Sequence, residues 1–336
     1  MGSLIRSTGL WGYPDLVREL GGDPTPLLAR FHLRPGVERE DDALVPLDAV
    51  LRILATTADE LDCPDFGLRM VRWQGLGILG PVAVIARNSD TVQDGLGAIA
   101  RYLYVHSPGL KLAAEPRDAG VGIRFVYEVV EPSAPDPRQG YELSMANVVL
   151  MLRLLGGPDA RLNTMSFLHD QMGPTAAYAE TFDCPVHFAQ EWCGFEIPSD
   201  LAARSIDSAD PETRRIATKY LEANYVPATA PMSERVAELT RRLLPTGHCT
   251  AETIAEQLGI HERTLRRQLT AEGTGCQEVI DHERRTLAEK YLADPRLQFG
   301  QIAAMLGYAE QSTLNRSCRR WFDKTPREYR SAAATS

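Results

Sequence analysis

Two short segments near the C-terminus are rich in side chains that recognise nucleic acids. If Glu262–Leu269 is helical, Leu265 and Leu269 lie on one face and three arginines (263, 266 and 267) lie on the other. The segment Gln311–Arg320 holds three more arginines (316, 319 and 320), Gln311 and Asn315, and no acidic residue. Arginine bridges O6 and N7 of guanine, and asparagine or glutamine bridges N6 and N7 of adenine. These residue types favour hydrogen bonding to base edges in a major groove.

A repeated motif predicts how both segments are positioned. The pattern I-A-x-x-L-G begins at Ile254 and again at Ile302, 48 residues later. Its alanine lets a second helix approach closely, and its glycine suits the left-handed turn that reverses the chain. An apolar residue, Ile260 or Tyr308, follows each turn. The spacing predicts two helix-turn-helix motifs, at about 250–271 and 299–322, separated by a helix.

Charge is distributed unevenly along the 336 residues. The net charge of −9, taken as one number, argues against a nucleic-acid partner. Residues 1–232, however, hold 20 basic and 31 acidic side chains, whereas residues 233–336 hold 16 and 14. Two prolines, Pro227 and Pro231, stop helices between these parts. We predict a sensing or dimerisation domain over 1–226, a linker over 227–232 and a DNA-binding domain over 233–331.

The front part alternates between helical and extended patterns. Apolar residues recur at helical spacing in 46–61, 91–104 and 141–155, and with period two near 110–112 and 121–127. Residues 164–168 and 186–188 resemble further strands, and Asp210-Pro211 begins another helix. This order predicts an α+β domain, followed by an all-α domain with the two helix-turn-helix motifs.

Motifs for catalysis, cofactors and metals are incomplete. Gly75–Gly80 satisfies GxGxxG, but the preceding residues 68–74 include two arginines and are unlike the buried strand that a nucleotide loop requires. We therefore predict a glycine-rich turn there. Neither His-Glu pair extends to HExxH, and the spacing of Cys184, His187 and Cys193 does not match a structural zinc site. We predict no enzyme activity, no cofactor and no metal.

Composition points to a cytoplasmic protein with no membrane association. The hydrophobic share of 44% and charged share of 24% are typical of globular domains. No stretch approaches the roughly 18 consecutive apolar residues of a membrane-spanning helix, and the N-terminus lacks a signal-peptide pattern. Six cysteines without a CxxC pair indicate reduced thiols.

The C-terminal part, from about Ser233 to Arg330, resembles the DNA-binding domain of AraC/XylS-type bacterial transcription regulators. The resemblance is carried by a long closing signature, QIA followed by LGYAEQS and then RRWFDKTPREYR, over residues 301–330. Two positions depart from the family pattern: Cys318 replaces the usual phenylalanine and Asp323 the usual glycine. Aspartate tolerates a left-handed helix cap, and Cys318 affects core packing without touching the DNA-binding face.

The front domain resembles the arabinose-binding-type domain of the same regulators through residues 77–82, 141–146 and 192–196. The whole chain is similar to mycobacterial VirS-type regulators. The resemblance implies that this domain senses an effector or mediates dimerisation, and it names no ligand. Candidate pocket residues are Tyr102, Tyr104 and Trp192, although aromatic residues in short elements are more often part of the core.

The family architecture implies that one monomer places two recognition helices in successive major grooves, about 34 Å apart. The positions that match the family's base-reading residues are Arg263, Arg266, Arg267, Gln311, Ser312, Asn315 and Arg316. We expect phosphate contacts from Arg319, Arg320 and Lys324. The implied partners are double-stranded promoter DNA, a small-molecule effector, RNA polymerase and a second copy of the chain.

We therefore predict a sequence-specific transcriptional regulator, an activator controlled by its front domain. A single arginine-bearing helix is often just a solvent-exposed surface helix. Two such helices, each following the same I-A-x-x-L-G turn, favour DNA binding. An enzyme fused to a DNA-binding tail would need a catalytic constellation within 1–232. A structural nucleoid protein would favour a basic chain with nonspecific contacts.

Overall fold

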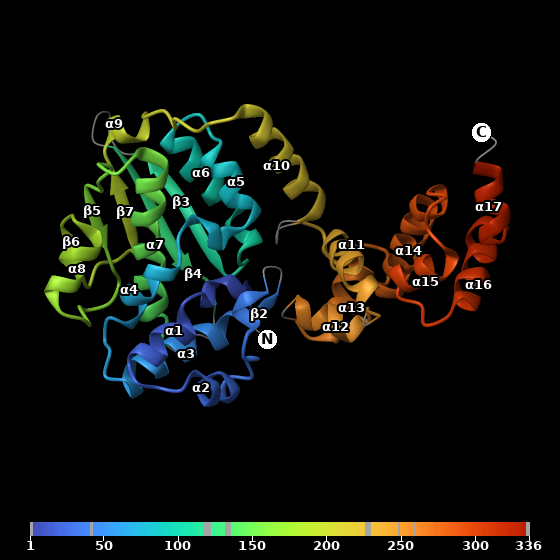
Figure 1. The fold of residues 1–336 in the computed structure, drawn as a ribbon, viewed down its shortest axis with the longest axis horizontal. Helices are drawn as coiled ribbons and strands as arrows, with labels where there is room; N and C mark the ends of the chain where they lie inside the picture. The colour runs from blue at the N-terminus through green and yellow to red at the C-terminus, as the bar shows by residue number, and fades with distance from the viewer. Residues whose placement is uncertain are drawn as a thin grey trace. The chain divides into compact units, whose positions relative to one another are not determined.

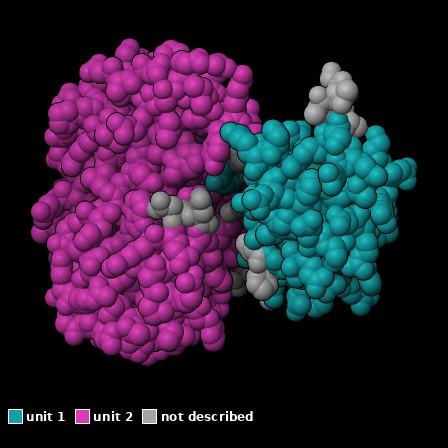
Figure 2. Space-filling model, turned by 45° about the vertical axis from the view of Figure 1, so that its right-hand side comes forward, with its two compact units in different colours: residues 1, 224–336 teal, residues 2–223 magenta. Residues whose placement is uncertain are grey.

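A computed structural model describes residues 3–40, 43–116, 122–131, 136–225, 230–247, 249–258 and 260–333. The chain forms two compact units, residues 2–223 and residues 224–336 (Figures 1 and 2). Within the predicted linker, residues 227–229 lie outside the described residues, and Met232 is already the first residue of a helix.

The N-terminal unit contains a five-stranded sheet. Its strands are β3 (Leu110–Pro116), β4 (Ile123–Val129), β5 (Thr164–Ser166), β6 (Val186–His187) and β7 (Gly194–Ile197). They lie in the order β3-β4-β7-β5-β6; the β5–β6 pair is parallel and the other pairs are antiparallel. A separate antiparallel pair joins β1 (Leu4–Arg6) to β2 (Leu44–Pro46). The extended patterns thus form strands, except that Val121 lies outside the described residues.

Helix α7 crosses in front of this sheet in the view of Figure 1, and the other helices of the unit lie beside it. The predicted helices over 46–61, 91–104 and 141–155 are confirmed as α3, α6 and α7, and a short 3-10 turn, Leu103–Val105, follows α6. The helices of this unit are α1 (Tyr13–Glu19), α2 (Pro24–Arg30), α3 (Leu47–Glu60), α4 (Phe66–Met70), α5 (Pro81–Arg87), α6 (Val92–Tyr102), α7 (Arg138–Gly156), α8 (Thr175–Phe182), α9 (Ser199–Ala202) and α10 (Pro211–Asn224).

Aromatic side chains join the sheet to α7. Phe125 of β4 and Phe195 of β7 are direct partners in the ladder, and their rings stack with centroids 5.0 Å apart. Two residues further along β4, Tyr127 contacts Tyr141 of α7 edge-on at 5.9 Å, and its hydroxyl lies 2.9 Å from Ser144 Oγ. Most residues of α7 are buried, so this helix and the sheet form the core of the unit.

The glycine-rich turn is preceded by helix rather than by strand. α4 continues into a 3-10 turn over Val71–Trp73, and a second 3-10 turn, Leu76–Leu79, leads into α5. Because a nucleotide-binding loop requires a parallel strand immediately before its first glycine, GxGxxG is a turn here, as predicted.

Among its described residues, the C-terminal unit contains helices joined by turns and no strand. Its helices are α11 (Met232–Leu243), α12 (Ala251–Gln257), α13 (Glu262–Ala271), α14 (Cys276–Ala293), α15 (Phe299–Met305), α16 (Gln311–Phe322) and α17 (Pro326–Ala333). The pairs α12–α13 and α15–α16 each have their own hydrophobic core. Helix α14 contributes Ile280 to the first core, and Ala288 and Leu292 to the second. The predicted fold class is therefore confirmed.

Candidate nucleic-acid interface

Capping and burial fix the orientation of α13. His261 precedes the helix, and its Nδ1 accepts a hydrogen bond of 3.2 Å from the backbone N–H of Arg263. Leu265 and Leu269 are buried in the first core, and Ile260 packs against the same core. Gly259, the predicted turn residue, lies outside the described residues. Since the two leucines lie one turn apart, their burial leaves the opposite face of α13 in solvent.

That opposite face carries the three predicted arginines. Arg263, Arg266 and Arg267 are all exposed. Among the described residues, no acidic side chain forms an ion pair with any of them. Within the described part of the chain, no carboxylate competes for these guanidinium groups, which present hydrogen-bond donors to solvent, as recognition of an anionic duplex needs.

The second motif turns at Gly307. Its φ of +73° is left-handed, and a Cβ at this position would lie 2.6 Å from the carbonyl oxygen of Leu244. Tyr308 follows, packs against the second core and places its hydroxyl 2.9 Å from Ser317 Oγ of α16. The turn therefore needs glycine both for its backbone conformation and for its close approach to another segment.

Helix α16 exposes the second set of predicted residues. Leu314 and Cys318 are completely buried, so Cys318 is a core residue, and Asp323 caps the helix with a left-handed φ of 54°. The Ser312 hydroxyl donates to Glu310, and Arg316 donates to Thr313 Oγ1 at 3.3 Å. The exposed predicted residues are Gln311, Ser312, Asn315, Arg316, Arg319, Arg320 and Lys324.

Arg320 differs from the other predicted DNA-contacting arginines because, among the described residues, it has an acidic partner. Its guanidinium donates to Asp281 of α14, and the other carboxylate oxygen of Asp281 accepts a 2.9 Å hydrogen bond from Trp321 Nε1. A phosphate contact by Arg320 would therefore compete with Asp281, and that contact stays a prediction. Sequence reasoning missed Asp281, which lies about 40 residues from its partners and belongs to no motif.

We expect Asp281→Ala to loosen α16. The change leaves the half-buried Trp321 N–H without its acceptor, which costs about 1 kcal/mol of local stability. Hydrogen exchange of residues 311–322 should accelerate accordingly. Asp281→Asn is the matched control, since its amide oxygen still accepts from Trp321. Equal exchange in the wild type and both variants would show that this contact does not hold the helix.

Contacts across the unit connect the two motifs. Arg284 of α14 donates to the carbonyl oxygen of Leu306 at 3.2 Å, and its guanidinium lies 5.1 Å from the centroid of the Tyr308 ring. Leu244, which meets Gly307, is fully buried. The second turn is thus held against the first half of the unit, and α13 and α16 are positioned by one packed structure.

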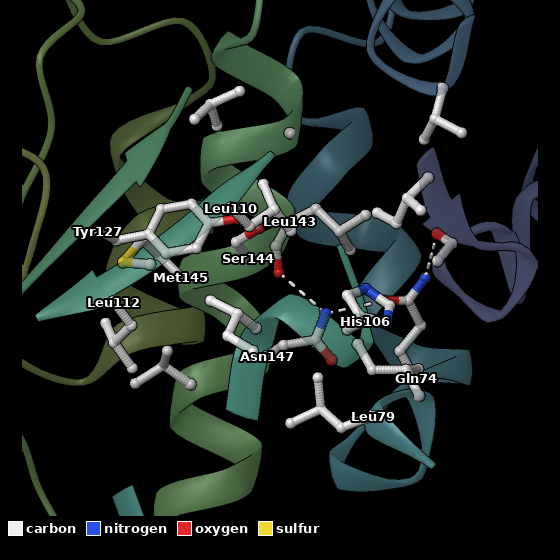
Figure 3. Close-up of a pocket in the computed structure, with 18 of the residues that line it drawn as sticks. Gln74, Leu79, His106, Leu110, Leu112, Tyr127, Leu143, Ser144, Met145 and Asn147 are labelled. Carbon is white, nitrogen blue, oxygen red and sulfur yellow. Dashed lines mark hydrogen bonds between the residues drawn. The ribbon is translucent and has the colours of Figure 1, made fainter. Parts of the chain in front are cut away.

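The N-terminal unit contains a cavity of about 90 Å³ between α3, α6, α7, β3 and β4 (Figure 3). None of the candidate pocket residues Tyr102, Tyr104 and Trp192 lines it. Tyr102 hydrogen-bonds Glu222 at 2.9 Å, and the ring of Trp192 stacks against Arg124 with a separation of 4.3 Å. Tyr102 instead lines a separate pocket beside α6 and α10, so the three candidates stay predictions. The cavity is lined by another aromatic residue, Tyr127, and by the polar Asn147 in the middle of the apolar helix α7. A polar residue at a buried position of an apolar helix is the signal that could have found this cavity.

Neither metal-binding clusters nor membrane-spanning helices occur among the described residues. No three His, Cys, Asp or Glu side chains gather there in a way that could hold a metal ion. In the same part of the chain, no helix is long and apolar enough to cross a membrane.

Two helix-turn-helix motifs that follow a separate α+β domain along the chain define the class of protein: a DNA-binding transcriptional regulator. Residues 21–206 match the family profile of the N-terminal arabinose-binding domain of AraC transcription regulators. Residues 254–332 match the profile of a helix-turn-helix domain. The chain belongs to the AraC family of transcription regulators, which is not a family of enzymes.

Several relatives match the chain over almost its full length. The chain is 60% identical over 336 residues to the HTH-type transcriptional regulator VirS of Mycobacterium tuberculosis, covering 100% of this chain and 99% of the relative. It is 31% identical over 328 residues to the ornithine utilization regulator of Pseudomonas aeruginosa, covering 95% and 94%. The crystal structure of the transcriptional regulator CdpR from P. aeruginosa matches with a TM-score of 0.42 and 22% identity, over 94% and 97% of the two chains.

Proposed function

We propose that the chain is a sequence-specific transcriptional activator that reads adjacent major grooves with α13 and α16 and responds to a small molecule bound by its N-terminal unit. One observation carries the DNA-reading part of this proposal. In both helices the leucine side chains are buried, while the exposed face carries arginine and glutamine, with asparagine in addition on α16. These side chains match the donor and acceptor patterns of guanine and adenine in the major groove.

We assign base contacts and phosphate contacts to individual residues by residue type and position. Arg263, Arg266 and Arg267 of α13, with Gln311, Ser312, Asn315 and Arg316 of α16, contact base edges. Arg319, Arg320 and Lys324 contact phosphates, which position the protein without reading sequence. The acidic N-terminal part opposes nonspecific association with DNA, so affinity depends on correct base contacts.

Arg266→Ala tests the base-reading role. We expect specific affinity to fall by about 1–3 kcal/mol and the preference at one base position to relax, because a bidentate contact is lost. A titration against operator variants, selected first with the wild-type chain, measures both effects. Lys290→Ala on α14 removes the same charge from another exposed position and should leave base preference unchanged. An Arg266→Ala variant with wild-type preference at every position would contradict the assignment.

Activation, contact with RNA polymerase and homodimerisation complete the proposal. A ligand that binds two conformations of the protein unequally shifts the population that is competent for DNA. Exposure of Ile216 and Tyr220 on α10, at 57% and 53%, supports contact with a second copy of the chain. Transcription reconstituted with RNA polymerase distinguishes activation from repression.

A further inference from the structure

The cavity in the N-terminal unit is almost entirely apolar. Leucine, isoleucine, valine and methionine side chains make up most of its wall, and no Asp, Glu, Lys or Arg is among its described lining residues. Its polar lining side chains are Gln74, His106, Tyr127, Ser144 and Asn147. None of these lining side chains supplies a counter-charge to an ion that has lost its hydration, so the cavity suits an uncharged occupant.

Hydrogen bonds fix the orientation of the Gln74 and Asn147 amides. Gln74 Nε2 donates to the backbone carbonyls of Gly9 and Trp11, both at 3.0 Å. Because both of those partners are acceptors, Gln74 Oε1 must face Asn147, whose Nδ2 donates to it at 2.7 Å. Asn147 Nδ2 also donates to the carbonyl of Leu143 at 3.0 Å. Both hydrogens of the Asn147 amide are therefore used within the protein.

This arrangement leaves Asn147 Oδ1 without a donor. Asn147 is 2% exposed, and its Oδ1 has no hydrogen-bond partner among the described residues. In Figure 3 the nitrogen of this amide is joined by dashed lines to its two partners, and the oxygen points away from both. A buried carbonyl oxygen without a donor costs about 1–3 kcal/mol. A ligand that supplies a donor would recover that energy.

His106 adds a second acceptor to the same wall. Burial, and then the nearby charge of Arg6, lowers the pKa of His106 to about 4, so the ring is neutral at physiological pH. A neutral imidazole carries one proton, and the hydrogen bond to the carbonyl of Ile78 uses it. Nδ1 is then an acceptor with no partner among the described residues. The hydroxyl groups of Tyr127 and Ser144, the other polar pair, hydrogen-bond to each other at 2.9 Å.

We infer that this cavity binds a small uncharged molecule with an apolar body and a hydroxyl or N–H group that donates to Asn147 Oδ1. The inference rests on the proposed role of the N-terminal unit as a small-molecule sensor. As formed, about 90 Å³ admits only a compact ligand. Met145 and Met151 line the cavity, and their unbranched side chains repack readily, so the space enlarges around a ring-sized occupant.

Phenol and toluene, two probes of similar shape, test the inference with the full chain. An apolar cavity without a free acceptor rejects phenol, because its hydroxyl loses water without compensation. We expect calorimetric titration of the wild type to give affinities for phenol and toluene within about threefold of each other. In Asn147→Leu, the affinity for phenol should fall at least tenfold relative to the affinity for toluene. Gln93→Leu makes the matching amide-to-leucine change at an exposed position of α6 that does not line the cavity, and it should keep the wild-type ratio.

Each other outcome has a definite meaning. If the wild type binds toluene but binds phenol at least tenfold more weakly, Asn147 is not a ligand acceptor. If neither probe binds, the cavity holds only water, and the site is rejected. A wild-type preference for toluene rejects the site even if Asn147→Leu does not fold. Assigning the acceptor to Asn147 rather than to His106 Nδ1 requires the variant, and an unchanged phenol-to-toluene ratio in Asn147→Leu would reject Asn147. Because binding is read on the protein alone, a parallel operator titration that fails would reject the regulator proposal and leave the ligand site standing.

Discussion

Gly307→Ala is expected to destabilise the second helix-turn-helix motif by about 2–4 kcal/mol and to abolish sequence-specific DNA binding by α16. A left-handed φ alone costs an alanine roughly 1–2 kcal/mol. The remainder comes from the 2.6 Å approach of the new Cβ to the Leu244 carbonyl oxygen. That oxygen also accepts the backbone N–H of Gly247 at 3.1 Å, so moving it disrupts a second turn.

Gly273→Ala is the matched control for this prediction. Gly273 follows α13, has a φ of +75° and would place a Cβ with no atom within 4 Å. It shares the backbone strain of Gly307 and lacks the collision, so we expect a loss of only about 1–2 kcal/mol. Denaturant unfolding and hydrogen exchange of residues 299–322 measure the difference. Equal losses in the two variants would mean that the contact with Leu244 does not position the second motif.

Glu142→Gln is expected to remove a large pH dependence from the stability of the N-terminal unit. Glu142 of α7 is fully buried, and its Oε1 accepts a hydrogen bond from the Tyr178 hydroxyl. That hydroxyl in turn accepts the backbone N–H groups of Met172 and Gly173. Burial, with a further contribution from the charge of Asp65, raises the pKa of Glu142 to about 7, although Tyr178 and Arg138 act in the opposite direction.

The raised pKa determines the sign of the effect. Below about pH 4.5 the carboxyl group is protonated in the folded and the unfolded chain, and stability is highest with respect to this group. Between pH 4.5 and 7 the unfolded chain has released the proton that the folded chain still holds, so stability falls as pH rises. The total loss is about 3 kcal/mol above pH 7.

Glutamine keeps the acceptor for Tyr178 but does not titrate. The variant should therefore match the wild type near pH 4.5 and exceed it by up to about 3 kcal/mol at pH 8. Urea unfolding of both chains across this range measures the difference. Glu180→Gln, an exposed glutamate on α8, changes the net charge equally and should leave the curve unchanged. If the free energy of unfolding changed with pH in the same way in the wild type and in Glu142→Gln, the titration of buried Glu142 would be refuted.

Local periodicity was sufficient to predict the face that each recognition helix presents. Leu265 and Leu269 lie one turn apart, so their burial alone directs Arg263, Arg266 and Arg267 into solvent. Gly307 was predictable in the same way, because a left-handed turn favours glycine. The partition of charge also required only counting. Each of these inferences depends on residues within a few positions of one another.

The cavity and the contact of Asp281 with Arg320 and Trp321 could not be predicted from local sequence. Gln74 and Asn147 are 73 residues apart, and Asp281 lies 40 residues from Trp321. Nothing in the local sequence shows that these side chains meet. The aromatic candidates Tyr102, Tyr104 and Trp192 lie outside this cavity, and Tyr102 lines another pocket. Asn147 was visible as a polar residue in an apolar helix, but its partners were not.

The sequence by itself determined the class of protein, the two helix-turn-helix motifs and the residue types on their exposed faces, because these follow from short-range periodicity and turn chemistry. Only the tertiary structure decided which hydrogen-bond acceptors stay unsatisfied inside the N-terminal unit. It also decided which of the predicted DNA-contacting arginines pairs with a carboxylate. Those properties depend on how distant elements pack, and packing brings together groups whose separation along the chain carries no signal of their contact.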